Sequence, residues 1–172
     1  KKSGDLFLDM TIHDFDMAYY LSQQNVKKVY STGSVFGDKE IKEIGDIDTA
    51  VTTITFENGS IATIDNSRKD NYGYDQRLEV FGSLGMSISQ NQLSNNNIIA
   101  NNKGIHYSKP LGFFLKRYSQ SYISIMNEFI NCLINKKEIS CGIKAGLDSL
   151  KIALAAKKSL NENLSLIHIS EP

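Results

Sequence analysis

The hydrophobic period of this chain changes twice, and that change limits the folds it can adopt. In the first segment, apolar residues recur at helical spacing: Leu8, Ile12, Phe15 and Tyr19. From residue 26 to about residue 109 they alternate instead, as they do in strands that have one covered face. Helical spacing returns over residues 114–135 and again over residues 142–163. The sequence therefore predicts a helix, a run of strands and two further helices.

Glycine-containing turns divide the alternating region into hairpins. The first turn is Glu57-Asn58-Gly59, where Gly59 can adopt the positive φ that a tight hairpin requires. Similar turns recur at residues 82–85 and 101–104. Successive hairpins build an antiparallel sheet rather than βαβ units. We therefore expect an α+β fold, a mostly antiparallel open sheet with helices packed on one face. The residues of the last helix expected to face inward are Leu147, Leu150, Leu154 and Ala155.

Composition narrows the class of protein. The 172 residues carry 19 basic and 19 acidic side chains, whereas nucleic-acid-binding proteins usually have a basic excess. No apolar run approaches the roughly 20 residues that span a bilayer. Two cysteines in a chain of this length do not form a disulfide scaffold, and they suit a reducing cytosol. We expect one cytoplasmic domain that binds neither nucleic acid nor membrane.

One carboxylate–imidazole pair has a spacing that suits catalysis. Asp9 and His13 are four residues apart, so a helix places their Cβ atoms on one face, roughly 5–6 Å apart. A His titrates near neutral pH, and a carboxylate can orient its ring. An ordinary surface pair has the same spacing. A metal site would need Asp14 and Asp16, but Asp14 lies on another face and no second His or Cys lies at ligand spacing, so we predict no metal.

Other chemistries find little support in the sequence. There is no Gly-x-Ser-x-Gly motif, and Cys132 and Cys141 have no neighbouring His, which favours structural thiols. The run Gly82-Ser83-Leu84-Gly85 lies in a predicted hairpin and opens no helix, so it is not expected to bind a dinucleotide phosphate. The polar stretch 66–77 is interpreted as a solvated connection, although its Tyr and Arg side chains could contact a polyol.

Four longer stretches of sequence are more specific than the short patterns above. Residues 4–18, GDLFLDMTIHDFDMA, closely resemble the first helix of the C-terminal domain of the glucose–fructose oxidoreductase/inositol dehydrogenase/MocA (GFO/IDH/MocA) family. Residues 72–83 are similar to a loop and strand of that domain, and residues 114–122 and 146–150 to its last two helices. The resemblance covers residues 4–163.

The resemblance implies a site and a cofactor. His13 would accept the proton of a substrate hydroxyl, with Asp9 as its catalytic partner, and Tyr74 and Tyr122 would contact the substrate. Hydride would pass from the same carbon to NAD or NADP, bound by an N-terminal Rossmann domain. The expected substrate is a cyclic polyol, myo-inositol, which would become 2-keto-myo-inositol in myo-inositol catabolism. The family's broad sheet implies self-association into a homo-oligomer, and Asp14 and Asp16 are interpreted as structural.

Two parts of the family pattern are missing from this chain: the Gly-x-Gly-x-x-Gly loop and the Glu-Lys-Pro segment that contains the family's catalytic lysine. We therefore expect residues 1–163 to be a substrate-binding and oligomerisation domain that is inactive without its cofactor domain. Residues 164–172 resemble translated adapter sequence, and we expect a non-native tail there; the alternative is a short native edge strand. Three alternatives stay open: a non-catalytic binding or scaffold module of the same fold, a dehydrogenase of another sugar or polyol, and a metal-dependent isomerase or hydrolase.

Overall fold

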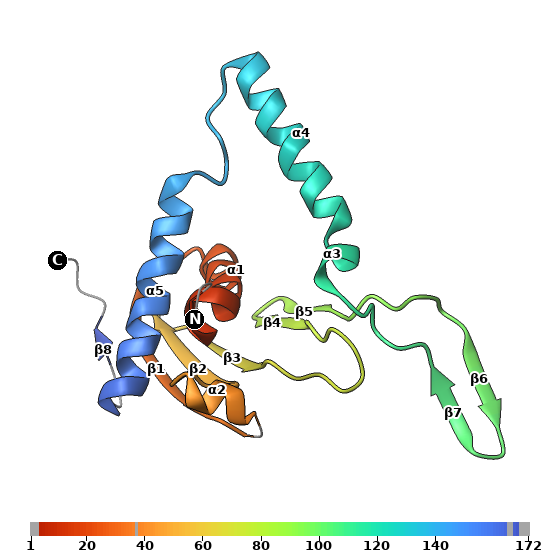
Figure 1. The fold of residues 1–172 in the computed structure, drawn as a ribbon. Helices are drawn as coiled ribbons and strands as arrows, with labels where there is room; N and C mark the ends of the chain where they lie inside the picture. The colour runs from red at the N-terminus through yellow and green to blue at the C-terminus, as the bar shows by residue number, and fades with distance from the viewer. Residues whose placement is uncertain (1–3, 37, 165–166, 169–172) are drawn as a thin grey trace. The chain divides into compact units, whose positions relative to one another are not determined.

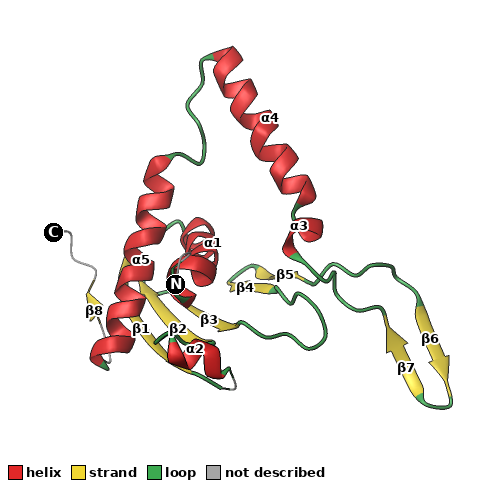
Figure 2. Ribbon diagram, in the orientation of Figure 1, coloured by secondary structure: helices red, strands yellow, loops and turns green. Residues whose placement is uncertain are grey.

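The computed structural model describes residues 4–36, 38–164 and 167–168. The chain divides into two compact units. The first unit comprises Lys1–Lys69 and Ser140–Pro172, and the second unit comprises Asp70–Ile139. Figures 1 and 2 show the elements of both units.

The first unit is a helix-covered antiparallel sheet. A π-helical turn, Phe7–Thr11, continues directly into α1. The other elements are α1 (Ile12–Ser22), β1 (Val26–Ser34), α2 (Lys39–Glu43), β2 (Thr49–Phe56), β3 (Ile61–Ser67), α5 (Ile143–Glu162) and β8 (Ile167–His168). The strand order is β3-β2-β1-β8, and every pairing is antiparallel. The turn between β2 and β3 has Gly59 at a φ of 85°, as the hairpin prediction requires.

The core of this unit lies between the sheet and two helices. Figure 1 shows α5 lying along β1, with α1 beside it. Buried side chains from the π-helical turn, α1, β1, β2 and α5 form one cluster, which includes Phe7, Phe15, Val29, Ile54 and Ile152. The predicted α+β class, with helices on one face of an antiparallel sheet, is confirmed.

The first helical segment buries a different set of residues from the one its spacing predicts. Leu6, Phe7, Thr11 and Phe15 are fully or almost fully buried, whereas Leu8, Ile12 and Tyr19 are only partly buried. A π-helical turn bonds residue i to residue i+5 and so holds one residue more than an α-helical turn. That extra residue changes the phase of the buried face before Phe15.

The inward face of α5 also differs from the prediction. Leu147, Leu150 and Leu154 are exposed in this structure. The buried residues are Ser149, Ile152, Ala153, Ala156 and Ser159. Small side chains let the helix axis approach the sheet closely, and the Ser31 backbone N–H donates to Ser159 Oγ at 3.0 Å. Small and polar side chains, and not the three leucines, therefore form the buried face of α5.

The second unit consists of two separate β-ribbons and a broken helix. The ribbons pair β4 (Leu78–Gly82) with β5 (Gly85–Ser89), and β6 (Ile98–Asn101) with β7 (Gly104–Tyr107). The predicted helix over residues 114–135 is confirmed, but it breaks at Tyr118 into α3 (Phe114–Arg117) and α4 (Ser119–Asn135). The strand predictions hold locally, since both ribbons pair as antiparallel hairpins.

The predicted non-native tail is only partly described. Ile167 and His168 pair with Val29 and Lys28 of β1 as a short edge strand. Residues 165–166 and 169–172 lie outside the described residues. The domain boundary at residue 163 and the origin of the tail stay predictions.

Candidate active site

Asp9 and His13 lie one turn apart at the start of the first unit. Asp9 belongs to the π-helical turn, and His13 is the second residue of α1. Their spacing puts them on one side of the helical segment. The His13 side chain is exposed, and the Asp9 side chain is 34% exposed. Both groups are therefore accessible from solvent. No hydrogen bond joins these two side chains in the described part of the chain.

The Asp9 carboxylate instead contacts an arginine just after β3. Arg68 Nη1 lies 3.5 Å from Asp9 Oδ2, and Arg68 Nη2 donates to Asp46 Oδ2 at 3.1 Å. Asp46 also accepts from the backbone N–H groups of Leu6, at 3.3 Å, and Ile47, at 2.8 Å. A planar guanidinium suits such contact with two carboxylates. Arg68 therefore links the end of β3 to the helical segment and to the loop before β2.

The other two acids of the first helix make structural contacts. Asp14 Oδ2 accepts from Asn66 Nδ2 at 2.8 Å, and the Thr11 hydroxyl donates to Asn66 Oδ1 at 2.8 Å. Asp16 Oδ1 accepts from the Ser149 hydroxyl of α5 at 2.9 Å. The structural interpretation of Asp14 and Asp16 is confirmed, because these hydrogen bonds tie α1 to β3 and α5.

The polar stretch 66–77 is not simply a solvated connection, and that interpretation is wrong for its first residues. Asn66 lies within β3 and Arg68 follows that strand, and both contact the first helical segment. The sequence does contain a signal for them. The alternation that turns Ala62 and Ile64 toward the helices continues to residues 66 and 68. Arg68 and Asp46 are the site residues that the sequence reasoning missed.

The second unit holds both tyrosines that are predicted to contact substrate. The Tyr74 hydroxyl donates to Gln76 Oε1 at 3.2 Å, and its ring meets Tyr118 edge-on with 6.4 Å between centroids. The Tyr118 hydroxyl also donates to Gln76, and Arg117 Nη2 donates to the Gln76 carbonyl at 2.7 Å. Tyr122, in α4, is 47% exposed. The loop thus positions Tyr74, and Tyr122 projects from the helix surface; their contact with substrate stays a prediction.

A carboxylate beside Tyr74 organises this loop. Arg77 donates to Asp75 through Nε at 2.8 Å and Nη2 at 2.9 Å, and Asn91 Nδ2 donates at 2.6 Å. The Tyr72 hydroxyl donates to the same carboxylate. The Arg77 guanidinium, with help from Tyr72 and Asn91, outweighs desolvation and lowers the pKa of Asp75 to about 2. Asp75 is therefore ionised at neutral pH and holds the loop together.

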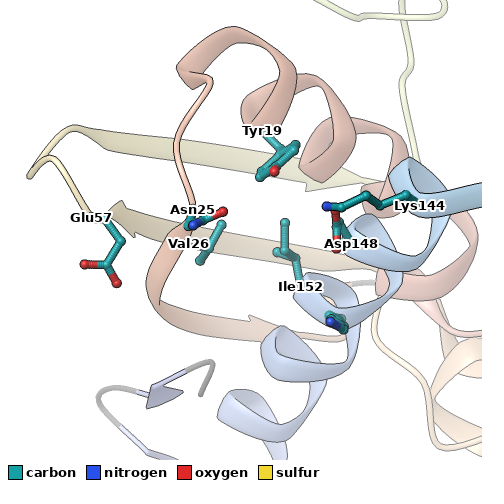
Figure 3. Close-up of a pocket in the computed structure, with 8 residues that line it drawn as sticks. Tyr19, Asn25, Val26, Glu57, Lys144, Asp148 and Ile152 are labelled. Atoms are coloured by element: carbon teal, nitrogen blue, oxygen red, sulfur yellow. The ribbon is translucent and has the colours of Figure 1, made fainter. Parts of the chain in front are cut away.

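A pocket of about 370 Å³ lies elsewhere in the first unit. Its lining includes Tyr19 of α1, Glu57 after β2, and Lys144 and Asp148 of α5 (Figure 3). Lys144 Nζ donates to Asp148 Oδ2 at 2.7 Å across one turn of α5. Neither Asp9 nor His13 lines this pocket. The pocket and the predicted catalytic pair are therefore separate features.

The other His, Cys, Asp and Glu side chains of the described ranges do not gather into a site. His, Cys, Asp and Glu side chains form no group of three or more there that could hold a metal ion. No helix in those ranges has both the length and the apolar composition that a membrane crossing requires. Cys132 is buried and its thiol donates to the Glu138 carbonyl at 3.4 Å, whereas Cys141 is exposed. Asp9 and His13 thus remain the chemical pair of interest.

Comparison with known proteins matches residues 1–88 to the GFO/IDH/MocA C-terminal domain. A curated relative, myo-inositol 2-dehydrogenase from Thermotoga maritima, is 43% identical over 164 residues, which cover 95% of this chain and 49% of the relative. The chain therefore spans about half the length of the curated relatives it matches.

Solved structures agree with this match. A myo-inositol dehydrogenase from Corynebacterium glutamicum superposes with a TM-score of 0.94 at 32% identity, covering 99% of this chain and 51% of that one. A scyllo-inositol dehydrogenase from Lactobacillus casei, with bound NAD(H) and scyllo-inositol, superposes with a TM-score of 0.90 at 26% identity. That match covers 98% of this chain and 49% of the other. Similarity thus extends over nearly the whole chain.

Proposed function

This chain belongs to the GFO/IDH/MocA family, and on that premise we propose that it is the substrate-side part of an NAD(P)-dependent inositol 2-dehydrogenase. The observation that supports this most strongly is the 43% identity to a myo-inositol 2-dehydrogenase over 95% of the chain. The proposed reaction oxidises myo-inositol to 2-keto-myo-inositol, as a step of myo-inositol catabolism in the cytoplasm.

The proposed role of His13 is to accept the substrate proton. Oxidation of a secondary alcohol takes a proton from oxygen and a hydride from carbon, and a C=O bond forms. The exposed imidazole of His13 is a base that can approach such a hydroxyl, and Asp9 lies four residues earlier in the same helical segment. A well-placed general base contributes roughly 10² to 10⁴ in rate. In this scheme Asp9 orients the ring and stabilises the imidazolium.

We infer that the described residues do not form a dinucleotide site. A phosphate cradle of the Rossmann type needs a glycine-rich loop that opens a helix. The Gly82–Gly85 turn joins β4 to β5 and opens no helix. We therefore assign no residue of this chain to NAD or NADP. We place hydride acceptance in the part of the relatives' length that this chain does not span.

Tyr74 and Tyr122 are the proposed substrate contacts. A tyrosine hydroxyl both donates and accepts hydrogen bonds, which suits a ring of hydroxyl groups. Tyr74 is held by Gln76 and Tyr118, so its hydroxyl has a defined position. The inositol isomer is the finer part of this proposal, since one superposed structure contains scyllo-inositol.

The outer face of the sheet is the proposed site of self-association. The helices cover one face, and the other exposes Tyr30 of β1, Val51 of β2 and Ile61 of β3. We propose that a second copy of this chain covers these side chains. Val51→Asp should reduce the oligomer measured by light scattering, and an unchanged mass would contradict the proposal.

A fusion tests the function directly. In the fusion, this chain replaces the matching half of the Thermotoga maritima myo-inositol 2-dehydrogenase. The assay measures NADH formation from myo-inositol and NAD⁺. We expect the fusion to oxidise myo-inositol and the 172-residue chain alone to be inactive. A folded but inactive fusion would contradict the proposal and favour a non-catalytic module. Activity of the chain alone would contradict the cofactor assignment.

A further inference from the structure

We propose that Arg68 is a positioning residue of the proton-transfer site. Its guanidinium, which Asp46 anchors, holds the Asp9 carboxylate in place. The inference rests on the proposed function, because it assigns Asp9 a role beside His13. It adds a residue that follows β3 to a site otherwise built from one helical segment.

Arg68 is itself held at two points. Its backbone N–H donates to the Asp48 carbonyl at 2.8 Å, and Nη2 donates to Asp46 Oδ2 at 3.1 Å. Asp46 is fixed in turn by the backbone N–H groups of Leu6 and Ile47. The side chain of Asp46 is 13% exposed and that of Arg68 is 22% exposed. The buried end of this network is therefore fixed, and Asp9 forms its open end.

Orientation is a better account of this network than stability. Partly buried ion pairs add little net stability, because desolvation offsets the attraction. Arg68 Nε is buried and has no hydrogen-bond partner among the described residues, which is a further cost. In return, Nη1 lies 3.5 Å from Asp9 Oδ2. Among the described residues, Arg68 is the only side chain at ion-pair or hydrogen-bond distance from the Asp9 carboxylate, so without Arg68 no polar partner restrains its rotation.

The π-helical turn explains why such a contact is needed. Asp9 lies inside this wider turn, whereas His13 lies in regular α-helix. Backbone geometry alone therefore does not direct Asp9 as it would in a continuous α-helix. Asn66, two residues before Arg68, bonds to Thr11 and Asp14 of the same segment. The end of β3 thus sets both the position of the helical segment and the direction of Asp9.

The test compares Arg68→Ala, Arg68→Lys and Asp46→Asn with the matched control Lys69→Ala. Lys69 is the next residue and pairs with Asp38 at 3.3 Å, away from Asp9. In the 172-residue chain, NMR Hα–Hβ couplings report the side-chain rotamer of Asp9. We expect one rotamer in the wild type and in Lys69→Ala. We expect averaging of the Asp9 rotamer in Arg68→Ala and Asp46→Asn. We expect partial averaging in Arg68→Lys, which keeps the positive charge but cannot contact two carboxylates with a planar guanidinium.

Kinetics of the same variants in the fusion give the second measurement. We expect Arg68→Ala to lower kcat by about 10- to 100-fold and to change KM by less than about twofold, since misplacement costs rate more than binding. Guanidinium at a concentration below that which unfolds the protein should restore part of kcat in Arg68→Ala but not in Asp9→Asn.

The outcomes separate this inference from the proposed function. An inactive fusion contradicts the function, and the couplings then still test Arg68 in the chain alone. A single Asp9 rotamer in folded Arg68→Ala overturns the inference. So does an unchanged kcat in an active fusion. If Arg68→Ala does not fold, Asp46→Asn and Arg68→Lys decide by the same two measurements.

Discussion

The two units of this chain are held together in different ways. The first unit buries a continuous apolar cluster between its sheet and its helices. In the second unit, Cys132 is the only residue that is buried among those described, and apolar side chains such as Phe81 and Met126 are exposed. The second unit derives its local order from hydrogen bonds around Gln76 and Asp75. Burial should make the first unit resist unfolding, whereas the second should open locally.

The residues with proposed roles divide in the same way. Asp9 and His13 belong to the packed unit, and Tyr74 and Tyr122 belong to the unit that is organised by polar contacts. Proton transfer needs groups held within a fraction of an ångström, whereas recognition of a polyol tolerates adjustable contacts. We therefore expect substitutions in the first unit to affect kcat or global stability, and substitutions in the second to affect KM or local order.

The largest expected effect separates chemistry from binding. His13→Ala in the fusion should lower kcat by roughly 10² to 10⁴, because the general base is lost, with little change in the KM for NAD⁺. Tyr74→Phe removes one hydroxyl and should mainly raise the KM for myo-inositol. Steady-state kinetics over both substrates measures this. A His13→Ala variant with normal turnover would show that the role assigned to His13 is wrong.

Core truncation is the next largest change. Phe15 is fully buried in the first unit, and Phe15→Ala should cost about 3–5 kcal/mol of unfolding free energy. Phe81 is 82% exposed in the second unit, so Phe81→Ala should change it by less than about 0.5 kcal/mol. Urea unfolding followed by circular dichroism gives both values. Equal losses would mean that the two units do not differ as described.

A glycine pair tests backbone geometry in the second unit. Gly73 has a φ of 134°, and a Cβ added there would lie 2.9 Å from the Pro110 carbonyl oxygen. Gly85 has a φ of 140° but no atom within 4 Å of an added Cβ. Gly73→Ala should therefore cost more than Gly85→Ala, by about 1 kcal/mol, through that steric contact. Hydrogen exchange at the Tyr74 amide, which donates to the Leu111 carbonyl, is the readout. Equal exchange in both variants would contradict this account.

Acidification gives the smallest effect. The pKa of Asp75 is lowered from 3.8 to about 2, so its contribution to stability is present above pH 3.8 and is lost as the pH falls toward 2. Over that interval the Tyr74 loop should open before the core of the first unit melts. NMR of the Gln76 amide, which donates to Asn91 Oδ1, reports the opening. Arg77→Gln should move it to higher pH, and an unmoved midpoint would show that Arg77 is not the cause.

In the first unit, the Asp5 carboxylate makes contacts that are also expected to be lost in acid. Asp5 accepts from the backbone N–H groups of Phe7 and Leu8, both at 3.0 Å, and lies 2.6 Å from Lys157 Nζ of α5. Burial raises the pKa of Asp5, but Lys157 and the two N–H groups outweigh it and hold the pKa below its ordinary value. The apolar core of this unit does not depend on the charge of Asp5. Protonation of Asp5 should therefore unfold only the first residues of the helical segment.

Much of the local structure was predictable. Alternation and turn glycines identify β2 to β7 within one or two residues and β1 within three, because strand period and hairpin geometry are local properties. The helices over residues 12–22, 119–135 and 143–162 follow from spacing for the same reason. The short helix α2 was not predicted, since it carries too few residues to show a period. The two-residue strand β8 matches only the alternative interpretation of the tail, a short edge strand.

The errors share one cause, which is dependence on distant residues. The π-helical turn shifts the buried face of the first helix, and Ser149, Ala153 and Ala156 replace the leucines of α5 at the sheet. Neither change follows from periodicity, because each depends on how closely another element approaches. The contact of Arg68 with Asp9 joins residues far apart in the chain, and only the packing of β3 beside the helical segment creates it.

The sequence by itself determined the local elements, the α+β class, the family resemblance and the pair Asp9 and His13, because periods, turns and motifs are written in neighbouring residues. Tertiary structure alone decided which helix faces of the first unit are buried and which charge meets Asp9. Those outcomes depend on close packing and on the pairing of buried charges, and both are settled only when segments distant in the chain meet.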